Sequence, residues 1–209
     1  MATVQIGMST LLQVLEVAGV VAFASSGLIE ARNKKMDAVG VFTVAFITAF
    51  GGGTLRDLLL DRRPLFWVQH QEYIILIFAM ALLAIPLLKH LRFSVAESLI
   101  VYVDALGLGL FSVTGTSLAV DAGMPVVVCV MMGVITGIFG GVLRDIICNE
   151  IPLVFRRGQL YATCSFVGCW VFLALDHVQS TQALALAGGI LMTFVMRVIA
   201  IRFNLKLPS

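Results

Sequence analysis

The chain has 209 residues, of which 60% are apolar and 12% are charged, and its mean hydropathy is +1.03. An ordinary soluble domain has roughly 45–50% apolar and about 25% charged residues, so this composition excludes that class and predicts a protein that lies mostly in membrane lipid. The formal net charge of +2 gives no basic footprint for nucleic acid, and we expect no nucleic-acid partner.

Seven apolar stretches are long enough to cross a bilayer, because about 20 apolar residues in a helix span ~30 Å of hydrocarbon. Charged or proline-containing loops separate them, and none of these loops is long enough to join separate domains. The sequence therefore predicts an all-α integral membrane protein with a single membrane domain, 1–209. The expected spans are 8–29, 38–60, 71–88, 96–118, 124–147, 159–176 and 182–203.

Basic residues are shared unevenly between the loops on the two sides of the membrane. Arg62 and Arg63 follow the second span. The loops and the tail on the other side carry nine: Arg32, Lys34, Lys35, Lys89, Arg92, Arg156, Arg157, Arg202 and Lys206. Since loops rich in Lys and Arg stay in the cytoplasm, the sequence predicts a cytoplasmic C-terminus and an N-terminus outside.

The first three spans are repeated in the next three. A shift of 88 residues aligns GGTLRDLLLDRRPL at 52–65 with GGVLRDIICNEIPL at 140–153 without a gap. The same shift pairs Glu16 with Asp104, Gly19 with Gly107, Phe23 with Phe111, Gly27 with Gly115, Thr48 with Thr136 and Tyr73 with Tyr161. We therefore expect repeat one over 8–90, repeat two over 96–178, and an unpaired seventh helix over 182–203. Because three spans is an odd number, the second repeat must be inverted, and inverted repeats place solute or ion sites near the midplane.

Glycine clusters lie at corresponding depths in the second and fifth spans. They comprise Gly51, Gly52 and Gly53 in one and Gly137, Gly140 and Gly141 in the other. Glycine costs about 1 kcal/mol relative to alanine in a helix and is a common place for kinks. One interpretation is that both helices kink and turn freed backbone carbonyls, near Gly52 and Gly140, toward a monovalent cation. The other is close packing through small residues. The symmetry of the clusters favours kinks.

An Arg-Asp pair follows each glycine cluster, Arg56 and Asp57 in the first repeat and Arg144 and Asp145 in the second. A charge inside a membrane costs from ~2.5 to above 10 kcal/mol, so such residues face a protein interior or pair with one another. They are candidates for a gate, because an arginine in a narrow pore raises a barrier that movement can relieve. The alternative is a structural arginine that snorkels or caps a neighbouring helix.

Acidic and hydroxyl side chains inside the spans are further candidates to line a path. Glu16 and Asp104 form a second symmetric pair of ionisable residues, and acidic side chains at this depth favour cations. Packing or interface contacts are the alternative for both. The hydroxyl candidates are Ser26, Thr48, Thr114 and Thr136, each of which can either hydrate a path or bond back to its own helix.

Enzymatic activity is not expected from the sequence. It contains no HExxH, no GxSxG and no paired aspartates in YD and GxGD contexts, which are the motifs of metalloproteases, serine hydrolases and intramembrane aspartyl proteases. The chain is therefore interpreted as a membrane transport protein with no catalytic residue and no cofactor.

With two inverted three-helix units, a seventh helix, and GGGTLRD and GGVLRD at mirrored positions, the sequence resembles the prokaryotic trimeric intracellular cation (TRIC) channels. The resemblance covers nearly the whole chain. It implies a multi-pass homotrimer in prokaryotic inner membrane lipid, with an hourglass path in each protomer. That path is pinched where the kinked second and fifth helices meet and conducts monovalent cations, potassium above all, with K⁺ or Na⁺ permeant.

Two qualifications come with the resemblance. Animal members carry a Lys-Glu-Val lipid-binding motif where this sequence has Leu58–Leu60 and Ile146–Cys148, so phosphoinositide binding is not implied. The same bacterial sequence domain is also described as a glycine-transporter domain. A secondary transporter of a small zwitterion such as glycine is therefore the alternative to a channel.

Overall fold

The computed structural model describes residues 2–89, 93–156, 159–178 and 181–205. Three of the basic residues used to predict orientation, Arg92, Arg157 and Lys206, lie outside this part of the chain. Every regular element in these ranges is helical. The predicted all-α class is therefore confirmed for the described residues.

The described residues form eight α-helices and one 3-10 turn. They are α1 (Ala2–Asn33), α2 (Ala38–Leu59), α3 (Phe66–Gln69), α4 (Gln71–Lys89), α5 (Phe93–Asp121), α6 (Val126–Ile147), η1 (Leu153–Phe155), α7 (Tyr161–His177) and α8 (Gln182–Arg202). Seven of the eight α-helices coincide with the seven predicted spans, and the four-residue α3 and the η1 turn lie in loops between them. Five contain a stretch long and apolar enough to cross a membrane: Thr10–Asn33, Ala38–Leu59, Ser98–Asp121, Val126–Ile147 and Gln182–Arg202. In α4 the apolar stretch is shorter, Gln71–Ala84.

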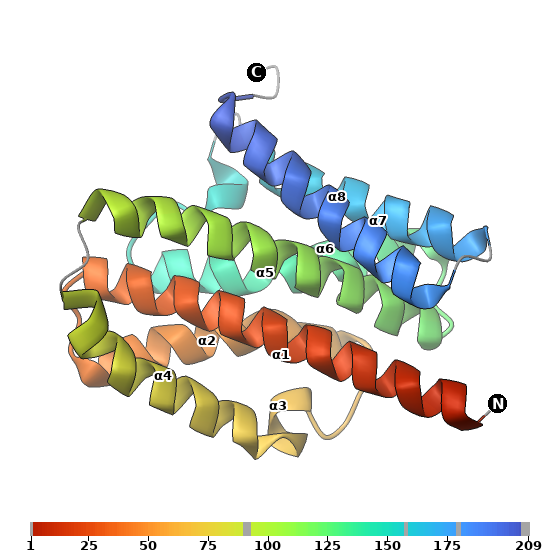
Figure 1. The fold of residues 1–209 in the computed structure, drawn as a ribbon, viewed down its shortest axis with the longest axis horizontal. Coiled ribbons are helices and arrows are strands. Elements are labelled where there is room, and N and C mark those ends of the chain that lie inside the picture. The colour runs from red at the N-terminus through yellow and green to blue at the C-terminus, as the bar shows by residue number, and fades with distance from the viewer. Residues whose placement is uncertain (1, 90–92, 157–158, 179–180, 206–209) are drawn as a thin grey trace.

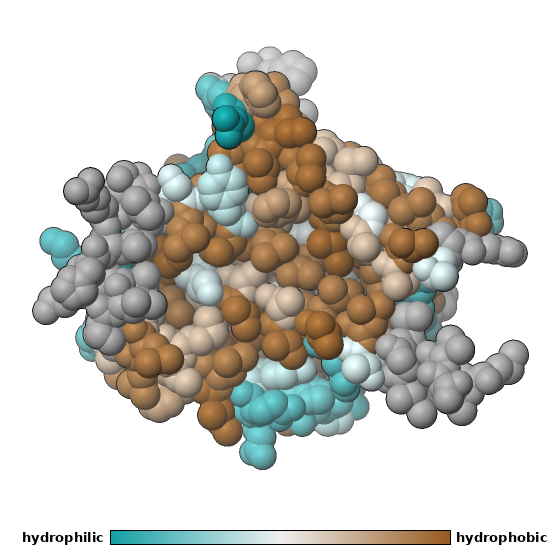
Figure 2. Space-filling model, in the orientation of Figure 1, coloured by the Kyte–Doolittle hydropathy of each residue, from teal (hydrophilic) through white to brown (hydrophobic). Residues whose placement is uncertain are grey.

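Helix α5 lies at the centre of the arrangement and contacts α1, α6, α7 and α8. Helix α1 lies beside α5, and Figure 1 shows the two running in opposite directions. The same is true of α2 and α6, which also pack together. Hydrophobic side chains cover most of the face seen in Figure 2, as expected for helices surrounded by lipid.

Left-handed residues end the helices at positions 88 residues apart. Lys35 (φ 56°) follows α1 and Gly123 (φ 70°) follows α5, while Asp61 (φ 50°) follows α2 and Asn149 (φ 56°) follows α6. At each site the next amide donates to a carbonyl five residues earlier in the chain, as in a Schellman cap. Glycine, asparagine and aspartate tolerate this conformation best, which explains three of the four residue types.

The interior between the two repeats is aromatic. Phe23 of α1 and Phe111 of α5 are both 1% exposed, and their ring centroids lie 5.2 Å apart. Each ring packs over a glycine of the other helix, Phe111 over Gly19 and Phe23 over Gly107. A side chain at either glycine would displace a ring, so these two glycines serve close packing.

Candidate functional site

Helices α2 and α6 approach most closely at Gly52 and Gly140. A Cβ atom added at Gly52 would overlap the carbonyl oxygen of Thr136, and one added at Gly140 would overlap that of Thr48. The two contacts are related by the shift of 88 residues. The glycine Cα–H groups therefore point at carbonyl oxygens of the opposite helix, a weak contact that recurs where helix backbones meet.

Both α2 and α6 run as continuous α-helices through their glycine clusters. The contacts show that Gly52 and Gly140 are used for close approach, because without Cβ atoms the two backbones can touch. A kink at these glycines stays a prediction. A cation at the Gly52 and Gly140 carbonyls stays a prediction.

The other predicted glycines also face packed neighbours. Gly51 faces Leu143, whose Cδ1 would lie 2.7 Å from an added Cβ; Gly53 faces the ring of Phe66, and Gly137 faces the Ser112 hydroxyl. Gly141 is different, because the nearest atom to an added Cβ is the Tyr161 hydroxyl at 3.1 Å. Packing thus accounts for three of these four glycines, and the fourth leaves space beside polar groups.

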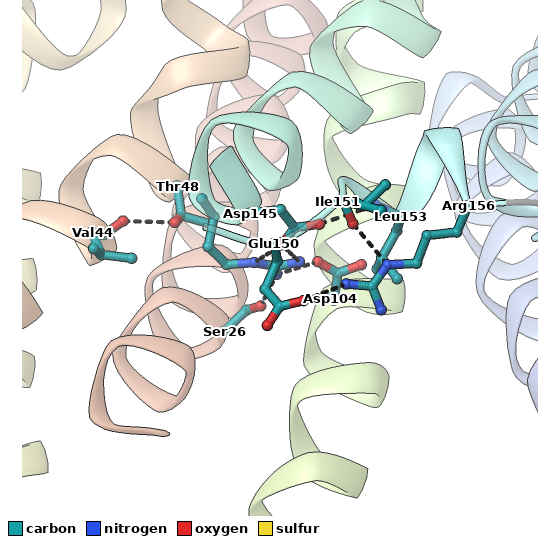
Figure 3. A network of polar contacts seen from close by, with 10 residues as sticks. Ser26, Val44, Thr48, Asp104, Asp145, Glu150, Ile151, Leu153 and Arg156 are labelled. Carbon is teal, nitrogen blue, oxygen red and sulfur yellow. Dashed lines mark hydrogen bonds and ion pairs between the residues drawn. The ribbon is translucent and has the colours of Figure 1, made fainter. Parts of the chain in front are cut away.

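Arg144 lies at the centre of a buried polar network that joins both repeats. Figure 3 labels its partners Ser26, Asp104 and Asp145. Its Nη1 donates to Asp104 Oδ1 at 2.6 Å and to the Ser26 hydroxyl. Its Nε donates to Asp145 Oδ1 at 2.8 Å, and its Nη2 lies 2.7 Å from the same oxygen. Arg144 and Asp104 are each 2% exposed. The network therefore neutralises a buried guanidinium with two carboxylates, as a charge at this depth requires.

Arg56, the counterpart of Arg144, is held less completely. Its Nε donates to Asp57 Oδ1 at 2.9 Å, and its Nη1 reaches Glu16 Oε1 at 3.3 Å. Nη2 lies 2.9 Å from Asp57 Oδ1 as an ion pair but makes no hydrogen bond. Its guanidinium carbon lies 5.3 Å from the centroid of the Phe66 ring. The structure thus brings together the predicted pairs, Arg-Asp with Glu16 and Arg-Asp with Asp104, in both repeats.

Two cavities lead to these arginine sites. One, of about 210 Å³, is lined by Glu16 and Asp57, and the other, of about 460 Å³, by Asp104, Arg144 and Asp145. Five lining positions of the first match five of the second after a shift of 88 residues: Leu12 with Ile100, Gln13 with Val101, Glu16 with Asp104, Asp57 with Asp145, and Arg62 with Glu150. Because α1 and α5 run in opposite directions, the cavities lie at opposite ends of the helices.

The four hydroxyl candidates divide into two kinds. Thr48, Thr114 and Thr136 donate to the carbonyls of Val44, Leu110 and Met132 respectively, four residues earlier in their own helices. Back-bonding, the alternative use, therefore accounts for these three. Ser26 instead joins the Arg144 network. All four are fully buried, and a role for them in lining a path stays a prediction.

Sequence reasoning did not single out Arg197 and Gln159, two further residues that line the larger cavity. Arg197 of α8 is 4% exposed, its Nη1 donates to Gln159 Oε1 at 3.1 Å, and its guanidinium carbon lies 4.9 Å from the Tyr161 ring centroid. The signal was available, because an arginine five residues before the end of an apolar span is as unusual as Arg56 or Arg144. It was missed because α8 has no repeat partner to draw attention to it.

An exposed ionic chain borders the same cavity. Lys34 Nζ lies 2.5 Å from Glu150 Oε1, and Arg156 Nη2 lies 3.3 Å from Glu150 Oε2. The hydrogen bond from Lys34 lowers the pKa of Glu150, and the same bond raises the pKa of Lys34. Both groups stay charged at neutral pH, but exposed pairs of this kind contribute little to stability.

Comparison with known proteins places the chain among membrane proteins. The family model described as "Glycine transporter" matches residues 13–89 and again residues 101–177, two segments that are themselves 88 residues apart. The chain is 35% identical to the UPF0126 inner membrane protein YadS of Escherichia coli over 93% of this chain and 94% of that protein. It is 36% identical to a UPF0126 membrane protein of Vibrio cholerae over 96% and 83%.

Solved structures give the same grouping. The TRIC trimeric intracellular cation channel orthologue from Rhodobacter sphaeroides superimposes with a TM-score of 0.88 at 35% identity, covering 94% of this chain and all of that chain. A prokaryotic TRIC channel in 0.5 M KCl superimposes with a TM-score of 0.89 at 29% identity, covering 95% of this chain and all of the other.

Proposed function

The chain belongs to the bacterial TRIC family, whose sequence domain is also described as a glycine transporter, and from this premise we propose that it is a monovalent cation channel, selective for potassium. Its structural relatives are described as cation channels, and the sequence relatives named above are described only as membrane proteins. Each protomer would conduct through its own path between the two repeats. The permeant ion is substrate, and the proposal needs no cofactor.

The observation that carries the proposal is the pair of repeat-related cavities ending at Arg-Asp sites. Together with the close crossing at Gly52 and Gly140, they outline an hourglass: two polar mouths at opposite ends and a constriction between them. Acidic residues line both mouths, which favours cations over anions. Because Arg56 and Arg144 are buried at the inner ends, we assign this conformation to the closed state.

The proposed architecture has seven transmembrane helices, namely α1, α2, α4, α5, α6, α7 and α8, in two inverted repeats, 8–90 and 96–178, plus α8 (182–203). The repeat-related contacts and the opposite directions of α1 and α5 support it. Opening would bend α2 and α6 at their glycines, where a helix bends most readily.

The alternative function is carriage of a small zwitterion such as glycine, which the description of the family model favours. A carrier needs a cation for the substrate carboxylate and an anion for its ammonium group. Arg144 and Asp104 place such a cation and such an anion side by side. The arginine is, however, already bonded to two carboxylates, so a glycine carboxylate would have to displace them.

Flux from proteoliposomes separates the two functions. We expect purified protein to release K⁺ down its gradient and to leave external ¹⁴C-glycine outside, because Arg56 and Arg144 at the inner ends of the mouths are already paired with carboxylates. Empty liposomes are the control. Saturable glycine uptake with no K⁺ release would refute the channel.

Assembly is expected to be trimeric, as in the TRIC relatives. The glycines inside α1 and α5 pack within the protomer, and the large apolar side chains that remain exposed on it offer surface for contacts between copies. A detergent-corrected mass from light scattering should correspond to three copies of the 22.5 kDa chain. A stable mass of one or two copies in several mild detergents would rule out the trimer.

Orientation is proposed from the loop charges, with the C-terminus in the cytoplasm and the N-terminus outside an inner membrane. The described residues that support it are Arg32, Lys34, Lys35, Lys89, Arg156 and Arg202, against Arg62 and Arg63. A green fluorescent protein fused after Ser209 should fluoresce and a fused alkaline phosphatase should be inactive. The opposite pattern would reverse the assignment.

A further inference from the structure

We infer that the oxygens around Arg144 form a monovalent cation site, and that the guanidinium occupies this site in the closed state as a tethered cation that the permeant ion must replace. The inference rests on the proposed function and specifies the binding site within it. Asp104 Oδ1, Asp145 Oδ1 and the Ser26 hydroxyl are the ligands that the arginine now uses.

The chemistry of these ligands fits an alkali cation. Two carboxylate oxygens and one hydroxyl converge on one guanidinium. The carboxylate oxygens lie 2.6–2.8 Å from its nitrogens. Alkali and other hard cations prefer oxygen ligands of this type. Ser26 comes from α1 and Asp104 from α5, so the site lies where the two repeats meet.

A fourth oxygen faces the same place and makes no hydrogen bond among the described residues. The Tyr161 hydroxyl belongs to a residue that is 1% exposed, and it makes no hydrogen bond in the described part of the chain. It lies 3.1 Å from the position that a Cβ of Gly141 would occupy, with Asp104 Oδ1 3.7 Å and Arg144 Nη2 3.9 Å from that point. The glycine thus leaves a small space between these groups. An unbonded buried hydroxyl costs free energy, and a cation or its water in this space would satisfy it.

The site is reachable from one end of the protein. Asp104, Arg144 and Asp145 line the cavity of about 460 Å³, which is bordered by the exposed residues Glu150 and Arg156. A hydrated cation arriving through this mouth meets the carboxylates before it meets the constriction at Gly140.

The Arg56 site also has two carboxylates and a cavity, but it differs in its hydroxyl and in the space beside its glycine. Thr114, the counterpart of Ser26, donates to the Leu110 carbonyl and not toward the arginine. The space beside Gly53, the counterpart of Gly141, is filled by the Phe66 ring. We therefore assign the cation site to the Arg144 end alone, and Arg56 provides a matched control.

Displacement of the arginine and entry of a cation are coupled by charge. If the Arg144 side chain leaves, Asp104 and Asp145 remain as two buried carboxylates with no cation, which is strongly unfavourable. A K⁺ or Na⁺ ion that takes its place restores the single positive charge that the guanidinium supplied. Cation binding therefore favours the open conformation, and the large cation N-methyl-D-glucamine, which cannot fit beside Gly141, does not.

Removal of the arginine tests the site directly through stability. We expect detergent-solubilised Arg144→Gln to melt at a Tm at least about 4 °C higher in KCl than in equimolar N-methyl-D-glucamine chloride, because an ion that binds only the folded state stabilises it. The wild type and Arg56→Gln should show a much smaller difference. Adding Asp104→Asn to Arg144→Gln should abolish the shift. Equal Tm values of Arg144→Gln in the two salts would overturn the proposal.

A second variant keeps the arginine and tests the unbonded ligand. Tyr161→Phe should leave Tm unchanged, because its hydroxyl makes no hydrogen bond, but should lower K⁺ flux roughly 3- to 10-fold. Tyr73→Phe, at the equivalent position of repeat one, is the matched control. Unchanged flux with a lowered Tm would show that the hydroxyl is structural and would overturn the assignment. If Arg144→Gln does not fold, the result for Tyr161→Phe decides whether the site exists.

The Tm shift of Arg144→Gln does not require conduction. A K⁺-dependent shift without K⁺ flux would therefore retain the cation site and reject the channel.

Discussion

Gly52→Ala is expected to destabilise the protein by about 2 kcal/mol or more and to be among the most damaging single-methyl changes in the chain. The added Cβ would overlap the Thr136 carbonyl oxygen, which belongs to the backbone of α6 and cannot rotate away. The helices must move apart, and overpacking of this kind outweighs the gain of about 1 kcal/mol in helix propensity. The measurement is the Tm of the purified protein in detergent, taken as the temperature at which half of its oligomer peak is lost.

Gly51→Ala is the control for this change, one residue earlier in the same helix. Its added Cβ would meet the end of the flexible Leu143 side chain at 2.7 Å, which can rotate, so we expect a small effect. Gly140→Ala should match Gly52→Ala, because its Cβ would overlap the Thr48 carbonyl in the repeat-related contact. A Gly52→Ala protein as stable as Gly51→Ala would contradict this account of the crossing.

Asp104→Ala is expected to cost about 3–5 kcal/mol, because it leaves the buried Arg144 guanidinium short of one of its two carboxylates. Asp104 is 2% exposed and lies 2.6 Å from Nη1. Water from the cavity can solvate the guanidinium but cannot supply the lost negative charge, so the variant should give a low yield of folded oligomer and a strongly reduced Tm.

Glu150→Ala is the matched control for Asp104→Ala at the same cavity. Its carboxylate pairs with Lys34 and Arg156, but on the surface, and exposed pairs are worth only about 0–1 kcal/mol. Its Tm should therefore stay close to that of the wild type. Equal losses for the two variants would mean that burial does not distinguish the two ion pairs.

The helices were predictable because lipid constrains sequence strongly. A chain in hydrocarbon must satisfy its backbone internally, so apolar stretches of the right length form helices. The predicted stretches 38–60 and 124–147 correspond to α2 (Ala38–Leu59) and α6 (Val126–Ile147) within two residues. The predicted ends of α1 and α5 were less accurate, because both helices continue beyond the apolar region into residues whose hydropathy does not indicate a membrane span.

The arrangement of the arginine sites was only partly predictable. The shift of 88 residues identified Arg56 and Arg144 as equivalents, with Glu16 and Asp104 beside them. It could not reveal that Ser26 bonds to Arg144 while Thr114 bonds back to its own helix, since both residues carry a hydroxyl that can do either. The repeat describes what the two halves share, whereas the difference between them depends on side-chain geometry.

The role of the glycines was the least predictable feature. A kink and a close helix contact use the same residue for different reasons, one for backbone freedom and the other for the missing Cβ. Sequence symmetry is expected in both cases. The close contact itself is seen only in the position of the Thr48 and Thr136 carbonyls opposite Gly140 and Gly52, and that position depends on how two helices 88 residues apart in the sequence cross.

Single-channel recording tests the central claim, conduction of cations through the two acidic mouths, most directly. Purified protein in a planar bilayer under a KCl gradient should give unitary current steps that reverse near the equilibrium potential of K⁺, because acidic lining favours cations. Silent bilayers would contradict the channel if the same preparation takes up glycine into liposomes. Steps that reverse near the equilibrium potential of chloride would contradict its selectivity.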